Sequence, residues 1–289
     1  MPRTLAPRAA RRPSDPADVL VTRIAPTPSG YLHAGNAVNL VLTSWLARAR
    51  TGRLLLRIDD FDTVRARPEY LADVFDTLAW LGITADAGPA GPADFHSRWS
   101  MTTRLEQFRA ARDRLRAAHP GRVFVCRCSR RDLDPTGRCV AGCREHDLRL
   151  EPGRAVLRLA VPPGLTVGVR TAQLAVPAGD HVLWRRDDLP AYQLGSVVAD
   201  EDLGVTAIVR GMDLVASSAL QLHIAALLPA PGFARAELLH HDLITSPKGE
   251  KLSKSAGAQA HPLPRTPDLL ARIRTWAEQL GAPIGIGPA

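Results

Sequence analysis

The sequence lacks long apolar runs. No stretch approaches the roughly 20 apolar residues needed to cross a bilayer, and the N-terminus lacks the apolar core of a secretory signal. We therefore expect a cytoplasmic protein that does not bind membranes. Hydrophobic residues still make up 45% of the 289 residues, which suffices for a sizeable core. This length suits one large α/β unit, or a nucleotide-binding core with an inserted module.

Cysteine is also scarce, and the four copies are clustered. They form Cys126-Arg-Cys128 and Cys139-Val-Ala-Gly-Cys143, whereas a disulfide-stabilised secreted protein would spread its cysteines along the chain. Four thiolates match the tetrahedral coordination of Zn²⁺, and a site closed in this way is structural. The alternatives are free core cysteines or a disulfide in oxidised protein. We expect one structural zinc ion.

Positive charge is in excess over negative charge. The formal net charge of +8 favours polyanions such as tRNA. Nearly all the cations are arginine in a chain rich in Ala, Pro and Gly, so genomic base composition offers a second explanation. Charge therefore supports a nucleic-acid partner without proving one. Residues 1–19 are rich in Arg, Pro and Ala without periodicity, and we expect a disordered basic arm there.

The order of apolar segments predicts an α/β fold. Strands are expected near Val19–Ala25 and Leu54–Ile58, and each is followed by a helix, at about 36–50 and 68–80. This alternation indicates a doubly wound parallel sheet, whose ligands bind at the carboxyl ends of the strands. Later core elements are expected at 192–198 (helix), 206–210 (strand), 217–228 (helix) and 267–280 (helix).

Short segments broken by Pro and Gly between about 150 and 190 interrupt this alternation and indicate an inserted module. The predicted parts are the basic arm (1–19), the first half of the nucleotide-binding core (20–118), the inserted zinc-containing module (119–190), and the second half of the core with a C-terminal helix (191–289).

Two polar segments have the chemistry to handle phosphates. The first is the Pro- and Gly-rich turn before the first helix, which contains His33, Gly35 and Asn36. Gly35 allows close approach of a nucleotide, the helix N-terminus attracts phosphate, and His33 can donate a hydrogen bond to it. The second is Gly249-Glu-Lys251-Leu-Ser-Lys254-Ser255, where Lys251 and Lys254 could neutralise a departing pyrophosphate. Each segment alone would also suit an ordinary surface turn.

Together, the two segments resemble the signatures of the class I aminoacyl-tRNA synthetases. His33-Ala-Gly-Asn36 is similar to their HIGH motif and Lys251-Leu-Ser-Lys-Ser255 to their KMSKS motif, in the expected order. No Walker-type phosphate loop competes with them. The resemblance implies a Rossmann-type core that binds ATP through His33, Gly35, Asn36 and Lys254, with His33, Lys251 and Lys254 as catalytic residues.

The resemblance is strongest to the glutamyl branch and covers about residues 21–260. Its motifs match Arg23-Ile-Ala-Pro, Arg57-Ile-Asp-Asp60, Ala191-Tyr192-Gln-Leu and Val209-Arg210-Gly-Met-Asp213. The implied glutamate-binding residues are Arg23, Ile24, Ala25, Pro26, Thr27, Asp59, Tyr192 and Arg210. Asp59 would pair with the α-ammonium group, while Tyr192 and Arg210 would hold the carboxylate end of the substrate. An arginine there selects an acid over its amide.

Two departures from the glutamyl branch bear on the product. The glutamyl branch usually has Glu at the position of Asp59, whereas the glutaminyl branch has Asp there. Arg210 argues for glutamate, because the glutaminyl branch lacks an arginine at that position. Only about thirty residues follow Ala260, where a full glutamyl-tRNA synthetase continues into an anticodon-binding region. In this the chain resembles the truncated glutamyl-queuosine tRNA(Asp) synthetases, which attach activated glutamate to the queuosine base of the tRNA(Asp) anticodon and share the cysteine spacing, commonly with Tyr in place of Cys139.

The expected reaction begins with attack of the glutamate carboxylate on the ATP α-phosphate, assisted by Mg²⁺, to give glutamyl-adenylate and pyrophosphate. The glutamyl group is then transferred to a tRNA, which we expect to be tRNA(Asp). The alternatives are another acceptor (a tRNA 3′ end, a carrier protein or a metabolite) or a catalytically silent RNA-binding paralogue. We expect a monomer because no long exposed apolar stripe is evident.

Overall fold

The computed structural model describes residues 19–169, 172–244 and 261–288. Two pairs of parallel strands form its centre: β1 (Val21–Ile24) with β2 (Arg53–Leu56), and β8 (Ala207–Gly211) with β9 (Glu237–His241). The backbone N–H of Thr206, just before β8, donates to the carbonyl oxygen at the start of β1 over 2.8 Å. The two pairs therefore adjoin and place the carboxyl ends of all four strands at one edge.

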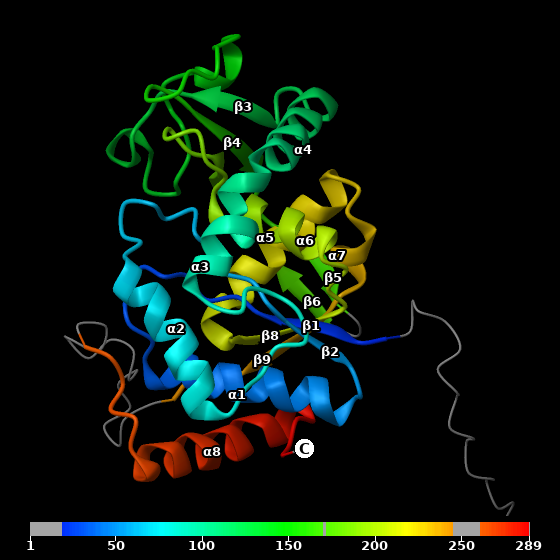
Figure 1. Ribbon diagram of the computed structural model, residues 1–289. Helices are drawn as coiled ribbons and strands as arrows, with labels where there is room; N and C mark the ends of the chain where they lie inside the picture. The colour runs from blue at the N-terminus through cyan, green and yellow to red at the C-terminus, as the bar shows by residue number, and fades with distance from the viewer. Residues whose placement is uncertain (1–18, 170–171, 245–260, 289) are drawn as a thin grey trace, which may run out of the picture.

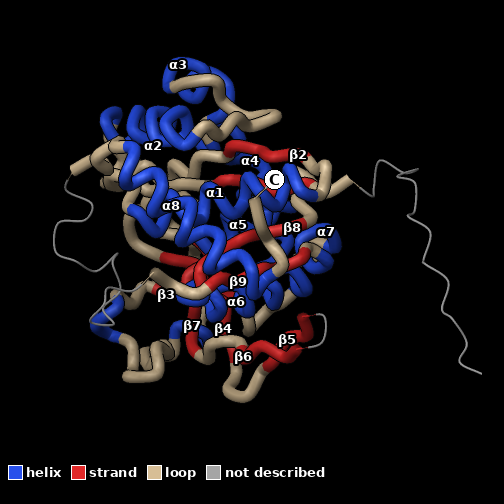
Figure 2. The backbone as a smooth tube through the Cα atoms, turned by 90° about the horizontal axis from the view of Figure 1, so that it is seen from below, coloured by secondary structure: helices blue, strands red, loops and turns tan. Residues whose placement is uncertain are grey.

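Helices cover both faces of these strands (Figures 1 and 2). Helix α1 (Ala34–Ala49) and helix α8 (Pro267–Gly281) lie side by side on the lower face in Figure 1, with α2 (Pro68–Leu81) packed into the same core. Helices α5 (Tyr192–Asp202) and α6 (Val215–Leu227) cover the upper face. This arrangement confirms the mixed α/β fold.

Alternation along the strands divides the interior into two cores. In β8, Ala207 and Val209 face the core of α1 and α8, whereas Ile208 faces the core of α5 and α6. In β1, Ile24 likewise belongs to the lower core. Because side chains alternate with a period of two, the neighbouring positions Arg23 and Arg210 point to the upper face, toward α5 and α6.

The segment between the two halves of the parallel sheet contains antiparallel strands. Strands β3 (Val123–Cys126), β4 (Val156–Val161) and β7 (Gly179–Trp184) form one sheet, and β5 (Thr166–Val169) and β6 (Ala172–Ala175) form a separate hairpin. Both contribute to the core shared with α5 and α6, to which helix α4 also belongs. The change of strand direction lies within 119–190, but the domain boundaries themselves stay a prediction. The remaining elements are α3 (Pro92–Asp94), η2 (Phe95–Trp99), η3 (Met101–Arg104), α4 (Leu105–Ala118), η4 (Arg130–Asp132), η5 (Cys143–Glu145), η6 (Met212–Leu214), α7 (Pro231–Arg235) and η8 (Ala282–Ile284).

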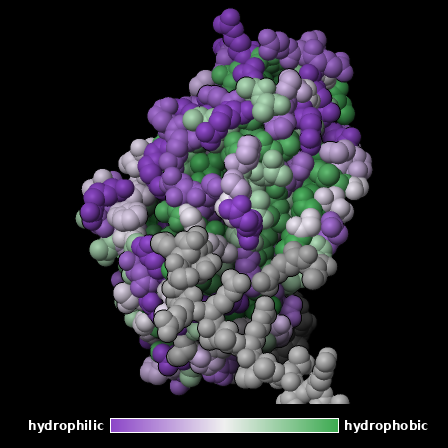
Figure 3. Space-filling model, turned by 90° about the vertical axis from the view of Figure 1, so that its right-hand side faces the viewer, coloured by the Kyte–Doolittle hydropathy of each residue, from purple (hydrophilic) through white to green (hydrophobic). Residues whose placement is uncertain are grey.

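Apolar side chains are exposed on part of the surface. Figure 3 shows a band of apolar surface down the middle of one face, bordered by polar side chains. The large apolar side chains exposed among the described residues are Val64, Val140, Tyr192 and Met212. The monomer therefore stays a prediction. No helix within the described part of the chain is both long and apolar enough to cross a membrane.

Candidate functional site

An open cavity of about 260 Å³ lies at the carboxyl ends of β1 and β8 and at the N-terminus of α1. Residues predicted from the sequence make up much of its lining: Arg23, Ala25, Pro26, His33, Gly35, Asn36, Asp59, Tyr192 and Arg210. The fold therefore brings the first phosphate motif and most of the predicted glutamate-binding residues to one cavity. Of the other predictions, Ile24 is buried in the lower core, and Lys251 and Lys254 lie outside the described residues.

The N-terminus of α1 is built by a reciprocal pair of hydrogen bonds. The backbone N–H of Asn36 donates to His33 Nδ1 over 3.3 Å, and the Asn36 side-chain oxygen accepts from the His33 backbone N–H over 3.0 Å. Because Nδ1 accepts, this geometry assigns the ring proton of a neutral His33 to Nε2. A Cβ at Gly35 would lie 3.0 Å from His33 Cε1, so only glycine leaves ordinary space for the folded-back ring.

A buried ion network lies on the upper face of the sheet beside the cavity. Asp200 of α5 accepts from Arg23 Nε over 3.0 Å and from Arg57 Nη1 over 2.5 Å. Arg57 also donates to both oxygens of Asp59, over 2.6 and 3.0 Å. Burial alone would raise the pKa of Asp200, but the charges of Arg23 and Arg57 outweigh it and lower that pKa. Both the Arg57 and Asp200 side chains are therefore charged, and they hold Asp59 and Arg23 in position.

Arg210 differs from these two arginines in its partners. Its Nη1 donates to Ser218 Oγ over 3.1 Å and to Gln221 Oε1 over 2.7 Å, and both acceptors are neutral. Its Nη2 is buried, and no described residue accepts a hydrogen bond from it. Burial lowers the pKa of Arg210, but arginine stays charged in proteins. Asp59 and Asp213 line the cavity with the three arginines, and the buried Asp200 acts on Arg210 through its charge. Among the described residues, however, ion pairs join carboxylates to Arg23 and Arg57 and none joins one to Arg210.

Asn39 and His241 line the same cavity, and neither was predicted from the sequence. The Asn39 side-chain amide lies 3.1 Å from His241 Nε2, while His241 Nδ1 lies 2.8 Å from the carbonyl oxygen of Asp242. Nδ1 must donate to that carbonyl, so Nε2 accepts from Asn39. Burial lowers the pKa of His241, which keeps the ring neutral. Asn39 and His241 thus add two polar, uncharged side chains to the lining of the cavity.

A second cavity, of about 510 Å³, shares Asp59 and Tyr192 with the first. Thr27 lines this second cavity and not the first, so it faces the neighbouring space. Arg130 and Arg185, from the segment with antiparallel strands, also line it. The second cavity therefore lies between the parallel core and that segment, next to the candidate substrate site.

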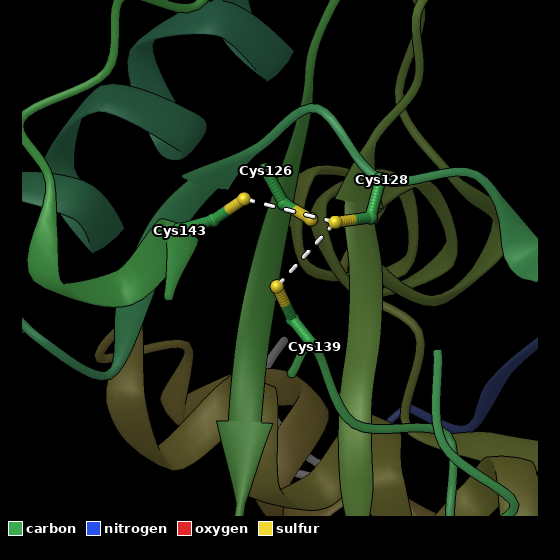
Figure 4. Close-up of side chains that lie close together, drawn as sticks. All are labelled: Cys126, Cys128, Cys139 and Cys143. Atoms are coloured by element: carbon green, nitrogen blue, oxygen red, sulfur yellow. Dashed lines mark hydrogen bonds between the residues drawn. The ribbon is translucent and has the colours of Figure 1, made fainter. Parts of the chain in front are cut away.

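The four cysteines converge at one point (Figure 4). All four Sγ atoms lie within 4.8 Å of one another, and Cys128 Sγ lies 3.6 Å from Cys139 Sγ and 3.7 Å from Cys143 Sγ. Ligands at a Zn–S distance of about 2.3 Å in a tetrahedron are about 3.8 Å apart, so the donor set fits zinc. Burial and the neighbouring thiols raise the pKa of Cys128. A cation at the centre would reverse that effect, because it stabilises thiolates.

The backbone around the cysteines is held by one acidic side chain. Asp180 of β7 accepts from the backbone N–H of Cys139 over 2.8 Å and pairs with Arg144 over 2.7 Å. Arg158 of β4 donates to the Asp180 carbonyl over 2.9 Å. The cysteine ligands are thus carried by a sheet and loops that are already cross-linked by buried polar contacts, which is the arrangement expected of a structural site.

Comparison with known proteins identifies the class. The family described as tRNA synthetases class I (E and Q), catalytic domain, matches residues 19–263. The chain therefore belongs to the class I aminoacyl-tRNA synthetases of the glutamyl and glutaminyl group, which are ligases.

Individual relatives indicate which branch of this family the chain resembles. The chain is 38% identical over 278 residues to a protein of Burkholderia cenocepacia (strain HI2424) named glutamyl-Q tRNA(Asp) synthetase, covering 90% of this chain and 87% of that protein. A protein of the same name from Pseudomonas entomophila is 38% identical, covering 93% and 89% of the two chains. Glutamate–tRNA ligase 2 of Dinoroseobacter shibae is 36% identical and is covered over 56% of its length. The resemblance to glutamyl-queuosine tRNA(Asp) synthetases is confirmed.

Solved structures confirm the fold. The glutamate-tRNA synthetase of Elizabethkingia anophelis superposes with a TM-score of 0.65 at 22% identity, covering 83% of this chain and 53% of that one. The methionyl-tRNA synthetase of Mycobacterium tuberculosis superposes with a TM-score of 0.52 at 16% identity. The chain spans about half the length of the first of these structures.

Proposed function

We propose that the protein activates glutamate with ATP and transfers the glutamyl group to the queuosine base of tRNA(Asp). The observation that carries the first step is Arg210, a buried guanidinium that lines the cavity and forms no ion pair with a described carboxylate. A buried charge without a partner costs several kcal/mol, and an anionic substrate would supply the partner. The names of the relatives support glutamate as that anion and tRNA(Asp) as the acceptor.

Glutamate would lie across the cavity between Arg210 and Asp59. Its side-chain carboxylate binds Arg210 with help from the Tyr192 hydroxyl, and its α-ammonium group faces Asp59. Asp59 is held by the bidentate contact with Arg57, which orients its carboxylate. Ala25, Pro26 and Arg23 also line the site, and Asp200 holds Arg23 in place. Glutamine would leave the charge of Arg210 unpaired, so the acid is selected.

ATP would bind at the N-terminus of α1. The free backbone N–H groups there and the positive end of the helix dipole attract its phosphates, and Gly35 permits close approach. His33, whose Nδ1 is occupied by Asn36, presents an Nε2–H as a donor toward phosphate. Lys251 and Lys254, outside the described residues, are proposed to neutralise the departing pyrophosphate. Mg²⁺ would accompany ATP as part of the substrate.

The first chemical step needs no protein base because the α-carboxylate of glutamate is already ionised at neutral pH. One of its oxygens attacks the α-phosphorus, the bond to the β-phosphate oxygen breaks, and pyrophosphate leaves with that electron pair. His33 and the helix N-terminus stabilise the charge on the α-phosphate as the new bond forms. An acceptor nucleophile then attacks the glutamyl carbonyl carbon, and AMP leaves.

The second cavity is the proposed approach for the acceptor. It adjoins the activation site through Asp59 and Tyr192, and two arginines from the segment 119–190 line it. We assign that segment as the inserted acceptor-type module, with 20–118 and 191–289 as the halves of the core. Within the module, Cys126, Cys128, Cys139 and Cys143 would hold one structural Zn²⁺.

Exchange of labelled pyrophosphate into ATP tests the activation step. We expect exchange that depends on glutamate and is at least about 100-fold weaker with glutamine, since a buried polar mismatch gives discrimination of this order or more. Absence of exchange with glutamate, glutamine and aspartate would refute activation. The transfer step is tested with labelled glutamate and tRNA(Asp) that carries or lacks queuosine. Equal labelling of the two tRNAs would instead favour another acceptor, such as the tRNA 3′ end.

A further inference from the structure

The three buried arginines of the cavity fall into two kinds. Arg23 and Arg57 share Asp200, and Arg57 also pairs with Asp59, so two carboxylates balance these two charges within the protein. Arg210, on the same face of the sheet, donates to the amide oxygen of Gln221 and to the hydroxyl oxygen of Ser218. Gln221 and Ser218 are fully buried, so no solvent contact accounts for their polarity. The two kinds differ in the charge of the group that accepts their hydrogen bonds, since Asp200 acts on Arg210 through its charge without a hydrogen bond to it.

A neutral histidine extends this arrangement. His240 is the register partner of Arg210 across the parallel pair β8–β9, and its Nε2 lies 2.9 Å from Ser218 Oγ. Burial, together with the charge of Arg210, lowers the pKa of His240 to about 4, so the ring is uncharged at neutral pH. Ser218 can then accept from Arg210 and donate to His240. The guanidinium is held in place by a chain of uncharged groups.

We propose that Gln221, Ser218 and His240 form an uncharged cradle that positions Arg210 while leaving its charge for the carboxylate of the substrate. Glutamine and glutamate are nearly equal in size and shape, so either would fit at position 221. The two residues differ there in charge. A glutamate there would form a buried ion pair with Nη1 at the present 2.7 Å contact. The protein would then carry its own substitute for the substrate. This inference rests on the proposed binding of the glutamate side chain by Arg210.

The test places an internal carboxylate at either acceptor. In Gln221→Glu and Ser218→Asp, we expect the KM for glutamate in pyrophosphate exchange to rise at least about tenfold, because each charged hydrogen bond lost to the substrate weakens binding to this extent or more. The KM for ATP should stay within about twofold, and the preference for glutamate over glutamine should fall at least about tenfold. The thermal melting temperature should be unchanged or higher, since a buried charge gains a partner.

Neutral replacements at the same positions are the matched controls. Gln221→Met and Ser218→Ala remove an acceptor without adding charge, so they should keep the preference for glutamate over glutamine within about threefold even if KM rises. Gln279→Glu, an exposed position on α8, makes the same chemical change far from the cavity and should change neither KM. If either neutral variant loses the preference as fully as the charged variants do, shape and not charge is decisive, and the inference is wrong.

Failure of this inference is distinguishable from failure of the proposed function. If the unmodified protein shows no glutamate-dependent exchange, the proposed function fails. If it does show exchange and a folded Gln221→Glu or Ser218→Asp variant keeps the original KM for glutamate, activation stands and the uncharged cradle is refuted. Should both charged variants fail to fold, the two neutral variants still decide through their preference for glutamate over glutamine.

Discussion

Asp200 is a buried carboxylate that holds two arginines of the site, so its neutralisation should be costly. The side chain is fully buried and accepts from Arg23 and Arg57 at 3.0 and 2.5 Å. Asp200→Asn keeps the size but removes the charge. Arg23 would then lose its ion pair, and Arg57 would keep only the pair with Asp59 among those described. Removing one partner of a buried ion pair costs about 3–5 kcal/mol of unfolding free energy, and we expect a loss in that range.

Urea unfolding followed by tryptophan fluorescence measures this loss, and the same helix supplies the control. Asp202, two residues further along α5, pairs with Arg104 at 2.8 Å but is 45% exposed. Asp202→Asn should cost at most about 1 kcal/mol, because exposed ion pairs contribute little. Equal losses in the two variants, or a loss below about 1 kcal/mol in Asp200→Asn, would refute the assigned role of the network.

The pH dependence provides a second check on the same residue. The folded pKa of Asp200 lies below its ordinary value, because the charges of Arg23 and Arg57 overcome the effect of burial. A depressed folded pKa stabilises the protein above the unfolded pKa of about 3.9, and that contribution is lost as the pH falls through the folded pKa. The difference in unfolding free energy between the original protein and Asp200→Asn should therefore be full at pH 7 and shrink below about pH 4.

Three further predictions concern other parts of the molecule. Reduced protein is expected to contain one equivalent of zinc by elemental analysis, and Cys139→Ser should lower both zinc content and melting temperature; metal-free, fully folded protein would contradict the zinc site. Gly35→Ala places a Cβ 3.0 Å from His33 Cε1 and should raise the KM for ATP about tenfold, with the KM for glutamate unchanged; equal effects on both would contradict the assignment of the α1 N-terminus to ATP. Gly281→Ala places a Cβ 2.4 Å from the carbonyl oxygen of Ile286 and should lower the unfolding free energy by about 1–3 kcal/mol without affecting either KM, and unchanged stability would count against that packing.

Local sequence patterns predicted the positions of several helices. The first helix was expected at 36–50 and runs from Ala34 to Ala49, because its apolar residues recur at helical spacing and its start is marked by a polar cap. The helix α8 is likewise within a few residues of its expected range. Strand β9 was missed, because Glu237–His241 is only partly buried over four of its five residues and shows no alternation. Its place is decided by pairing with β8, which local sequence does not encode.

The site was predictable in its motifs but not in its ion pairs. The residues carried over from the resemblance to the synthetases line the same cavity, apart from Ile24, Thr27 and the two lysines outside the described residues. Asp200 was not predicted, because it stands in the run Asp200-Glu-Asp202 at the end of a helix, which is typical of a solvated surface. Its partners Arg23 and Arg57 lie 177 and 143 residues away, and only the folded sheet brings them together.

Helices α5 and α6 satisfy the buried arginines in different ways, one with a charged side chain and one with a neutral side chain. Each presents a fully buried polar side chain to the arginines below, Asp200 from α5 and Gln221 from α6. Asp200 forms ion pairs with Arg23 and Arg57, and together with Asp59 it balances their two charges, so both arginines are part of the protein framework. The amide satisfies the geometry of Arg210 but not its charge, so the free energy needed to complete the network is left for a ligand to supply. An amide ligand would accept hydrogen bonds from Arg210 without balancing its charge, whereas an acid would do both. The proposed selection of glutamate therefore depends on the neutral side chain at position 221 as well as on Arg210.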